Sequence, residues 1–168
     1  MKFSAKIIRP GLWGLTAADL RDVGRQAIAR TGFFWHVNFK PLHYQMSAFG
    51  KYGYRLRSRK WEARKAHQHP EAEGRPLVFT GESERAVLGA NRVEATAKDN
   101  SHYHADVILA NSKMNFHAFE ATKVTADEKD VLEAVFAREF EAGVEEVARL
   151  RGATSGQIEL WNSALEAA

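Results

Sequence analysis

Between Arg92 and Leu109 the sequence reads RVEATAKDNSHYHADVIL, and this stretch decides the fold class. Small or apolar residues alternate with polar ones on both sides of Asp99-Asn100-Ser101, which is a typical turn sequence. A period of two is characteristic of β-strands with one buried face. The stretch therefore predicts an antiparallel hairpin with strands over residues 92–98 and 103–109.

A long helix is expected after the hairpin. Thr125 and Glu128 have the spacing of a capping box, and the first turn that follows them is acidic. Apolar residues then recur at helical spacing from Leu132 to Leu150. The pattern predicts a helix over about residues 126–150, ended by Arg151-Gly152.

A second helix is expected before the hairpin. Thr16 has the character of an N-cap, with Asp19 three residues later as a partial capping box. Apolar residues at helical spacing predict a helix over about residues 17–30, and Thr31-Gly32 offers a stop. The aromatic run over residues 33–39 either extends this helix or forms a new element, and most of its rings are expected in the core.

Several shorter segments have weaker signals. Residues 2–8 fit a short strand or an arm, and Ser58 is a candidate cap for a short helix to about His67. Residues 51–57 are expected to be irregular, 67–74 to form a surface loop, and 82–88 to form a short helical piece.

Together these elements predict an α+β fold, with a small antiparallel sheet packed with an N-terminal helix and a long C-terminal helix. The length of 168 residues suits one domain. We expect that domain to span residues 1–150. Residues 151–168 are expected to form a weakly ordered tail or a short docking helix.

The composition limits the chemistry that the chain can perform. There is no cysteine, so disulfides, thiolate nucleophiles and cysteine metal sites are excluded. No segment approaches the roughly 18 apolar residues of a membrane span, so no membrane association is expected. The sequence has no nucleophile elbow and no phosphate-binding glycine loop. We therefore expect neither enzymatic activity nor a cofactor.

Charge is distributed unevenly along the chain. Residues 1–75 hold 15 Lys and Arg residues against 5 Asp and Glu residues, whereas residues 126–168 hold 4 against 10. One interpretation is that basic and acidic surfaces of neighbouring copies meet in a ring, or that the basic part faces nucleic acid. The other is that both are simply solvated faces.

A segment rich in basic and aromatic residues, 51–65, is the candidate interface for an oligomer or another partner. Arginine and aromatic residues are enriched at protein interfaces, but they also suit phosphate neutralisation and base stacking. A nucleic-acid-binding protein is therefore the alternative function. The candidate interface residues are Tyr52, Tyr54, Arg55, Arg57, Arg59, Trp61, Arg64 and Lys65, and the candidate DNA-facing residues are Lys51, Arg55, Arg59 and Lys60.

Histidines raise a metal hypothesis. His102, His104 and Asp106 are two residues apart on the second predicted strand, so they share one face and could hold a divalent cation. The same pattern is expected for the solvated face of a half-buried strand, and we favour that interpretation. A metal-dependent enzyme that uses these three residues is the second alternative.

The spacing of several motifs resembles phage head–tail connector, neck and tail-completion proteins, which are virion morphogenesis proteins of long-tailed phages. The resemblance covers roughly residues 33–150. It rests on His43-Tyr44, Tyr52-Gly53-Tyr54, Arg57-Ser58, Trp61, Arg64-Lys65, Arg75, the turn Pro76-Leu77-Val78-Phe79-Thr80-Gly81, Arg85, Phe116-His117-Ala118-Phe119-Glu120 and the helix start at Thr125 with Phe136. The chain departs from the family pattern at Glu82-Ser83-Glu84, where an apolar residue is frequent.

The resemblance implies a homo-oligomeric ring between the portal or head-completion proteins and the tail. It places the protein in the virion at the head–tail junction, after assembly in the host cytoplasm. Thr80-Gly81 would then cap and orient the short helix that follows. The basic segment could line a lumen through which DNA passes without sequence readout.

Overall fold

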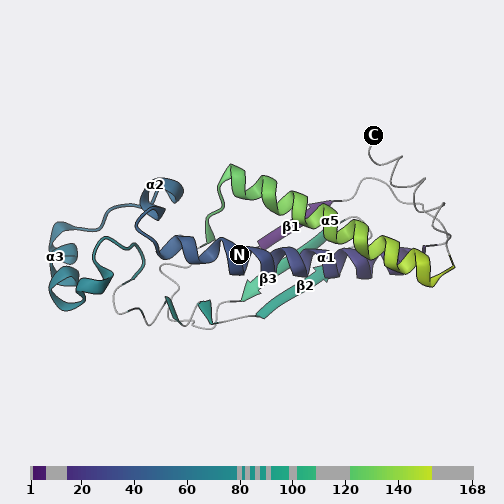
Figure 1. The fold of residues 1–168 in the computed structure, drawn as a ribbon, viewed down its shortest axis with the longest axis horizontal. Helices are drawn as coiled ribbons and strands as arrows, with labels where there is room; N and C mark the ends of the chain where they lie inside the picture. The colour runs from purple at the N-terminus through teal and green to yellow at the C-terminus, as the bar shows by residue number, and fades with distance from the viewer. Residues whose placement is uncertain are drawn as a thin grey trace. The chain divides into compact units, whose positions relative to one another are not determined.

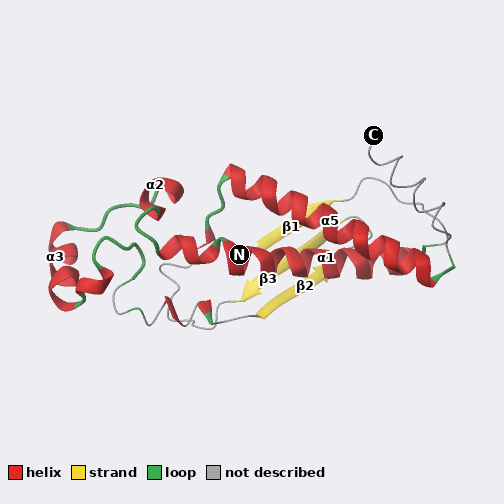
Figure 2. Cartoon of the chain, in the orientation of Figure 1, coloured by secondary structure: helices red, strands yellow, loops and turns green. Residues whose placement is uncertain are grey.

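Helices and a small antiparallel sheet make up the described part of the chain, which confirms the predicted α+β fold class. The computed structural model describes residues 2–6, 15–78, 81, 84, 85, 88, 89, 92–98, 102–108 and 122–152. In chain order its elements are β1 (Lys2–Lys6), α1 (Ala17–Asn38), the 3-10 helix η1 (Lys40–Tyr44), α2 (Ala48–Tyr52), α3 (Arg59–Gln68), the 3-10 helix η2 (Pro70–Ala72), β2 (Arg92–Ala97), β3 (His102–Ile108) and α5 (Ala126–Leu150), as Figures 1 and 2 show.

The predicted hairpin is present as β2 and β3, which are neighbours in a three-stranded sheet of order β1-β3-β2. Along β2 the side chains alternate between half-buried and exposed, and on β3 Tyr103 and Ala105 are buried. Residues 2–8 were expected to form a strand or an arm, and the strand is found. β1 pairs antiparallel with β3, and Phe3 lies opposite Ala105.

α5 has the bounds that the sequence predicted. Thr125 Oγ1 accepts a hydrogen bond from the Glu128 amide at 3.3 Å, and Glu128 Oε2 accepts one from the Thr125 amide at 3.2 Å. This reciprocal pair is the expected capping box. The helix ends before Gly152, whose φ of 87° only glycine adopts easily. Leu150, expected in the apolar stripe, is instead exposed.

The predicted end of α1 at Thr31-Gly32 is wrong, because the helix continues to Asn38. Thr31 Oγ1 donates to the Ala27 carbonyl at 2.9 Å, so the threonine satisfies its hydroxyl inside the helix. Gly32 is buried, and the aromatic run extends the helix and buries Trp35 and His36. The helix start was predicted correctly, since Thr16 and Asp19 exchange hydrogen bonds. These bonds hold the pKa of the Asp19 carboxyl below its usual value.

Two smaller predictions are corrected as well. Residues 51 and 52 were expected to be irregular, but they form the end of α2. Residues 67–74 were expected to form a surface loop, but they contain η2, whose Ala72 is fully buried. The short helix expected from Ser58 is α3. The helical piece at 82–88 is described only at residues 84, 85 and 88, which are helical. Residues 116–120 and the candidate docking helix in the tail lie outside the described residues.

Contacts group the chain into two compact units. Unit 1 takes in Gly32–Val93 and Val107–Leu132, whereas unit 2 takes in Lys2–Thr31, Glu94–Asp106 and the chain from Glu133. Consequently α1, β2, β3 and α5 each contribute residues to both units. The expectation of a single domain over residues 1–150 stays a prediction.

Tyr103 organises the packing of unit 2. Its ring is buried and lies near the rings of Phe136 and Phe140 of α5, with centroids 6.2 and 6.4 Å away. Its hydroxyl donates to the Leu20 carbonyl of α1 at 2.9 Å. One side chain of the sheet therefore contacts both helices of this unit, and Gly24 lets α1 approach the ring closely.

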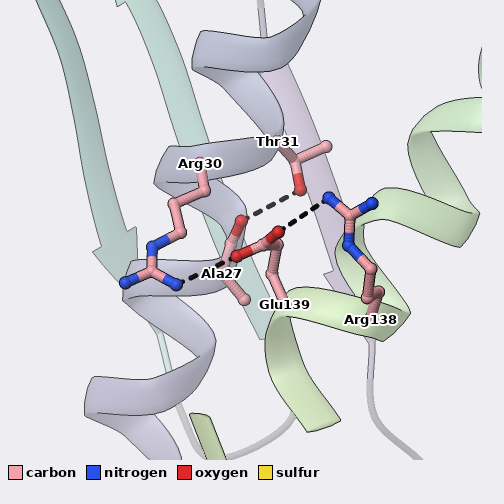
Figure 3. Close-up of polar contacts among 5 residues, drawn as sticks. All are labelled: Ala27, Arg30, Thr31, Arg138 and Glu139. Atoms are coloured by element: carbon pink, nitrogen blue, oxygen red, sulfur yellow. Dashed lines mark hydrogen bonds and ion pairs between the residues drawn. The ribbon is translucent and has the colours of Figure 1, made fainter. Parts of the chain in front are cut away.

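α1 and α5 also meet through side chains in unit 2. Val23 and Val144 form an apolar contact centre between them. Figure 3 shows Glu139 between two guanidinium groups, Arg30 at 2.9 Å and Arg138 at 2.8 Å. These two hydrogen-bonded partners keep the pKa of the Glu139 carboxyl below its ordinary value. Both arginines are well exposed, so the two pairs contribute little stability, and only the Arg30 pair joins α1 to α5.

Unit 1 has its own apolar core, built from short elements. Its buried members come from η1, α2, η2 and the segments around residues 54 and 78. They are Tyr44, Ala48, Tyr52, Tyr54, Ala72, Leu77 and Val78. Because these elements are short, side-chain contacts between them must supply most of the stability of the unit.

Candidate functional site

Residues 55–64 of unit 1 carry a strip of basic side chains. α2 ends at Gly53, whose φ of 61° lies in the left-handed region, and the chain then continues without regular structure to Ser58. Leu56 lies within this strip and is 79% exposed. We call this surface the basic strip, and its members are Arg55, Arg57, Arg59, Lys60 and Arg64.

α3 presents part of the basic strip to solvent. Ser58 caps the helix, and its side chain accepts a hydrogen bond from the Trp61 amide at 3.3 Å. Lys60 and Arg64 are one turn apart, so they lie on the same face, and both are exposed. Arg64 Nε donates to Gln68 at 3.1 Å on that face. The helix therefore displays Lys60 and Arg64 outward.

Lys65 does not belong to this surface, and its assignment to the interface is corrected. Its side chain is buried, and Nζ donates to the Arg75 carbonyl at 2.5 Å. The ammonium also lies 5.0 Å from the Trp61 ring centroid. Burial lowers the pKa of Lys65 below its usual value. The residue connects α3 to the segment that follows η2.

Tyr52 and Tyr54 are also interior residues, only 6% and 7% exposed. The Tyr52 ring stacks on His43 with centroids 3.9 Å apart, and the Tyr54 hydroxyl makes a short hydrogen bond with His43 Nδ1. Burial, followed by the Glu128 hydrogen bond, raises the pKa of Tyr52 above its ordinary value. Neither ring is available for an interface or for base stacking, so both predictions for these tyrosines are corrected.

Glu128 connects the start of α5 to this aromatic core. Its side chain is 2% exposed, and Oε1 accepts from the Tyr52 hydroxyl at 2.7 Å and pairs with Lys51 Nζ at 2.7 Å. Lys123 Nζ donates to the Tyr52 carbonyl at 3.0 Å nearby. Lys51 is thus engaged within the protomer and is not a free DNA-facing cation. The sequence signals marked Glu128 only as a cap residue.

A small hollow lies beside the basic strip. Phe49, Tyr54, Arg57, Trp61, Pro76 and Leu77 are among the residues that line it. Its free volume of about 10 Å³ is about the space of one water molecule. This hollow is too small for an organic substrate.

The predicted turn lies next to this hollow. Pro76 and Leu77 are buried, and Leu77 has a φ of 60°, which is unusual for a branched residue. Gly81 has a φ of 73°, and its carbonyl accepts from the Arg85 amide at 3.0 Å, so this residue begins a helical turn. Phe79 and Thr80 of the same motif lie outside the described residues.

Lys40 is a functional candidate that the sequence signals did not reveal. Its side chain is fully buried, and its ammonium lies 5.4 Å from the Trp35 ring centroid. Within the described part of the chain it has no hydrogen-bond partner. Burial lowers the pKa of Lys40 to about 8. The aliphatic stem suits the core, whereas the charge opposes burial.

Replacing Lys40 with methionine is expected to raise the free energy of unfolding at pH 7 by about 1–2 kcal/mol. Below pH 8 the folded protein must bury the charge, whereas from about pH 8 to 10.5 the unfolded chain holds a proton that the folded chain has lost. The stability of the wild type should therefore rise across this window relative to K40M. Urea unfolding at pH 7, 8, 9 and 10 measures this difference. Lys98, which is exposed, provides the control variant K98M, and parallel curves for wild type and K40M would contradict the prediction.

The candidate metal residues lie on β3, which pairs with β1. His102, His104 and Asp106 occupy every second backbone position of β3, as expected, so these positions share one face of the strand. In the register with β1 they lie opposite Lys6, Ser4 and Lys2, so two lysines are their cross-strand neighbours. Among the described residues there is no group of three or more possible metal ligands.

Comparisons with known proteins give no relative. No family model matches the chain, and neither a curated protein nor a solved structure matches it. Among the helices that the structure describes, none is both long and apolar enough to cross a bilayer.

Proposed function

We propose that the protein is a structural subunit of the ring that joins head and tail in a long-tailed phage or a prophage-derived particle, as a neck or tail-completion protein. The observation that carries this proposal is the basic strip of unit 1, a solvated contact surface with Leu56 exposed within it. Several arginines around an exposed apolar side chain match the composition of surfaces that meet another protein, where arginine is enriched. The motif spacing over residues 33–150 supports the choice of family.

The α+β architecture is compatible with this role. In the family that the sequence resembles, a turn leads into a short helix and a strand pair, and a long helix closes the fold. Here the turn at residues 76–81 precedes the hairpin, and α5 closes the described chain. The same order of elements is therefore available for a ring-forming adaptor in the virion.

Self-assembly is the first test of this proposal. Native mass spectrometry across a range of protein concentrations is expected to show one closed oligomer, and electron microscopy is expected to show a ring. A protein that stays monomeric at every concentration would overturn the proposal. Deleting the gene from its particle is expected to leave DNA-filled heads and tails unjoined, and expression in trans should restore joining.

Nucleic-acid binding remains the second candidate, because Arg55, Arg59 and Lys60 are exposed and could contact phosphates. The burial of Tyr52 and Tyr54 removes two of the three rings expected to stack on bases. Binding by the basic strip would then be electrostatic and independent of sequence. Strong, salt-dependent DNA binding by a monomer, without ring formation, would favour this candidate over the first.

A further inference from the structure

The first turns of α5 display an acidic surface. On the first turns of α5, Asp127, Asp130 and Glu133 are exposed, against the single cation Lys129. Asp127 and Asp130 have no ion pair within the described residues. Val131 lies among them and is 42% exposed. We call Asp127, Asp130, Val131 and Glu133 the acidic face.

The basic strip and the acidic face have matching properties. Residues 55–64 contain five basic residues and one acidic residue, Glu62. The Glu62 carboxylate lies 3.8 Å from the Lys65 ammonium. Each surface also contains one exposed aliphatic side chain, Leu56 or Val131. Apolar centres with charged rims of opposite sign can bury the aliphatic groups and neutralise the charges in one contact.

A nucleic acid would account for only half of this pattern. Phosphates could neutralise the basic strip, but they would not bury Leu56 and would be repelled by the acidic face. A second copy of the chain explains both surfaces at once, because each copy carries both. The observations therefore favour another copy as the partner.

We propose that the basic strip of one copy binds the acidic face of α5 in the next copy, an inference that rests on the proposed self-assembly. The two surfaces involve different elements, α3 with the preceding segment and the start of α5. Contacts between two different surfaces are heterologous, so they repeat from copy to copy and close into a ring when the rotation permits. Because exposed charges dominate the contact, assembly weakens as salt rises.

Charge reversal on either side tests this contact. One variant carries R55E, R59E and K60E, and the other carries D130K and E133K, which leave the capped first turn of α5 intact. Each variant alone places like charges opposite each other. Each is expected to need on the order of 100-fold higher concentration for half-assembly than the wild type, measured by sedimentation velocity.

Mixing the two variants gives the decisive result. The reversed strip of the first variant then meets the reversed face of the second, and the unchanged surfaces also match. Native mass spectrometry is expected to show restored oligomers that contain both variants in equal number. Far-UV circular dichroism and thermal unfolding check that each variant is folded, and D130K alone serves where the double change unfolds the protein.

A matched control separates this contact from net charge. The variant with R21E, R25E and K98E changes the net charge by the same amount as the variant with the reversed strip, at exposed positions of unit 2, and is expected to assemble as the wild type does. Assembly of both reversal variants at wild-type concentrations would overturn the inference and leave the proposed ring. Disruption by each without rescue on mixing would also overturn it. A wild type that never assembles would overturn the proposed function itself. If the variant with the reversed strip lost DNA binding but assembled normally, the basic strip would be assigned to nucleic acid instead.

Discussion

Replacing Glu128 with alanine is expected to lower the free energy of unfolding by about 2–4 kcal/mol. A buried tyrosine hydroxyl left without its acceptor accounts for about 1–3 kcal/mol, and the lost cap for about 1 kcal/mol. The Lys51 pair adds less than a fully buried pair would, because the lysine side chain is 35% exposed and can be rehydrated. Urea unfolding followed by circular dichroism measures the loss.

Two further variants distinguish the causes. E128Q keeps a single acceptor oxygen, which can serve either the Tyr52 hydroxyl or the Thr125 amide, and removes the charge. It should therefore lose less stability than E128A. E141A removes an exposed carboxylate from the same helix and is expected to change stability by less than about 0.5 kcal/mol. If E128A and E141A unfolded at the same urea concentration, the buried role of Glu128 would be refuted.

Replacing Gly24 with alanine is expected to destabilise the protein by about 3 kcal/mol, although alanine is the better helix former. A Cβ at this position would lie 2.1 Å from two atoms of the Tyr103 ring, far inside van der Waals contact. The ring is also held by its bond to the Leu20 carbonyl, so α1 or β3 must shift. Thermal and urea unfolding of G24A measure the effect.

The matched control for G24A is G50A. Gly50 is in α2, and nothing lies within 4 Å of the Cβ that alanine would add. G50A should therefore gain about 0.5–1 kcal/mol from helix propensity. In a Y103L background the penalty of G24A should largely disappear, because the ring is gone. Equal effects of G24A and G50A would show that the close approach of α1 to Tyr103 does not affect the free energy of unfolding.

Local sequence patterns predicted the elements whose boundaries depend on local contacts. The hairpin follows from strict alternation, and α5 follows from its capping box and from Gly152. The end of α1 could not be predicted in the same way. Thr31-Gly32 has the composition of a helix stop, but burial of the next turn, with Trp35 in it, outweighs that preference.

Which side chains of the candidate interface are buried could not be predicted, for a related reason. Between residues 51 and 65, aromatic and basic residues suit an exterior surface and an interior core equally well. Tyr52 is interior because it bonds to Glu128, 76 residues away in the sequence, and Lys65 is interior because it reaches the Arg75 carbonyl. Such distant partners leave no local pattern, whereas the outward Lys60 and Arg64 follow directly from helical spacing.

The bonds of Glu128 also affect how α5 opens. The terminal turn of a helix ordinarily frays first, and its amide protons then exchange with deuterium quickly. Here the carboxylate that caps this turn is held by Tyr52 in the core of unit 1. The Glu128 amide proton should therefore exchange only when that core opens, at the slow rate of the Tyr52 amide.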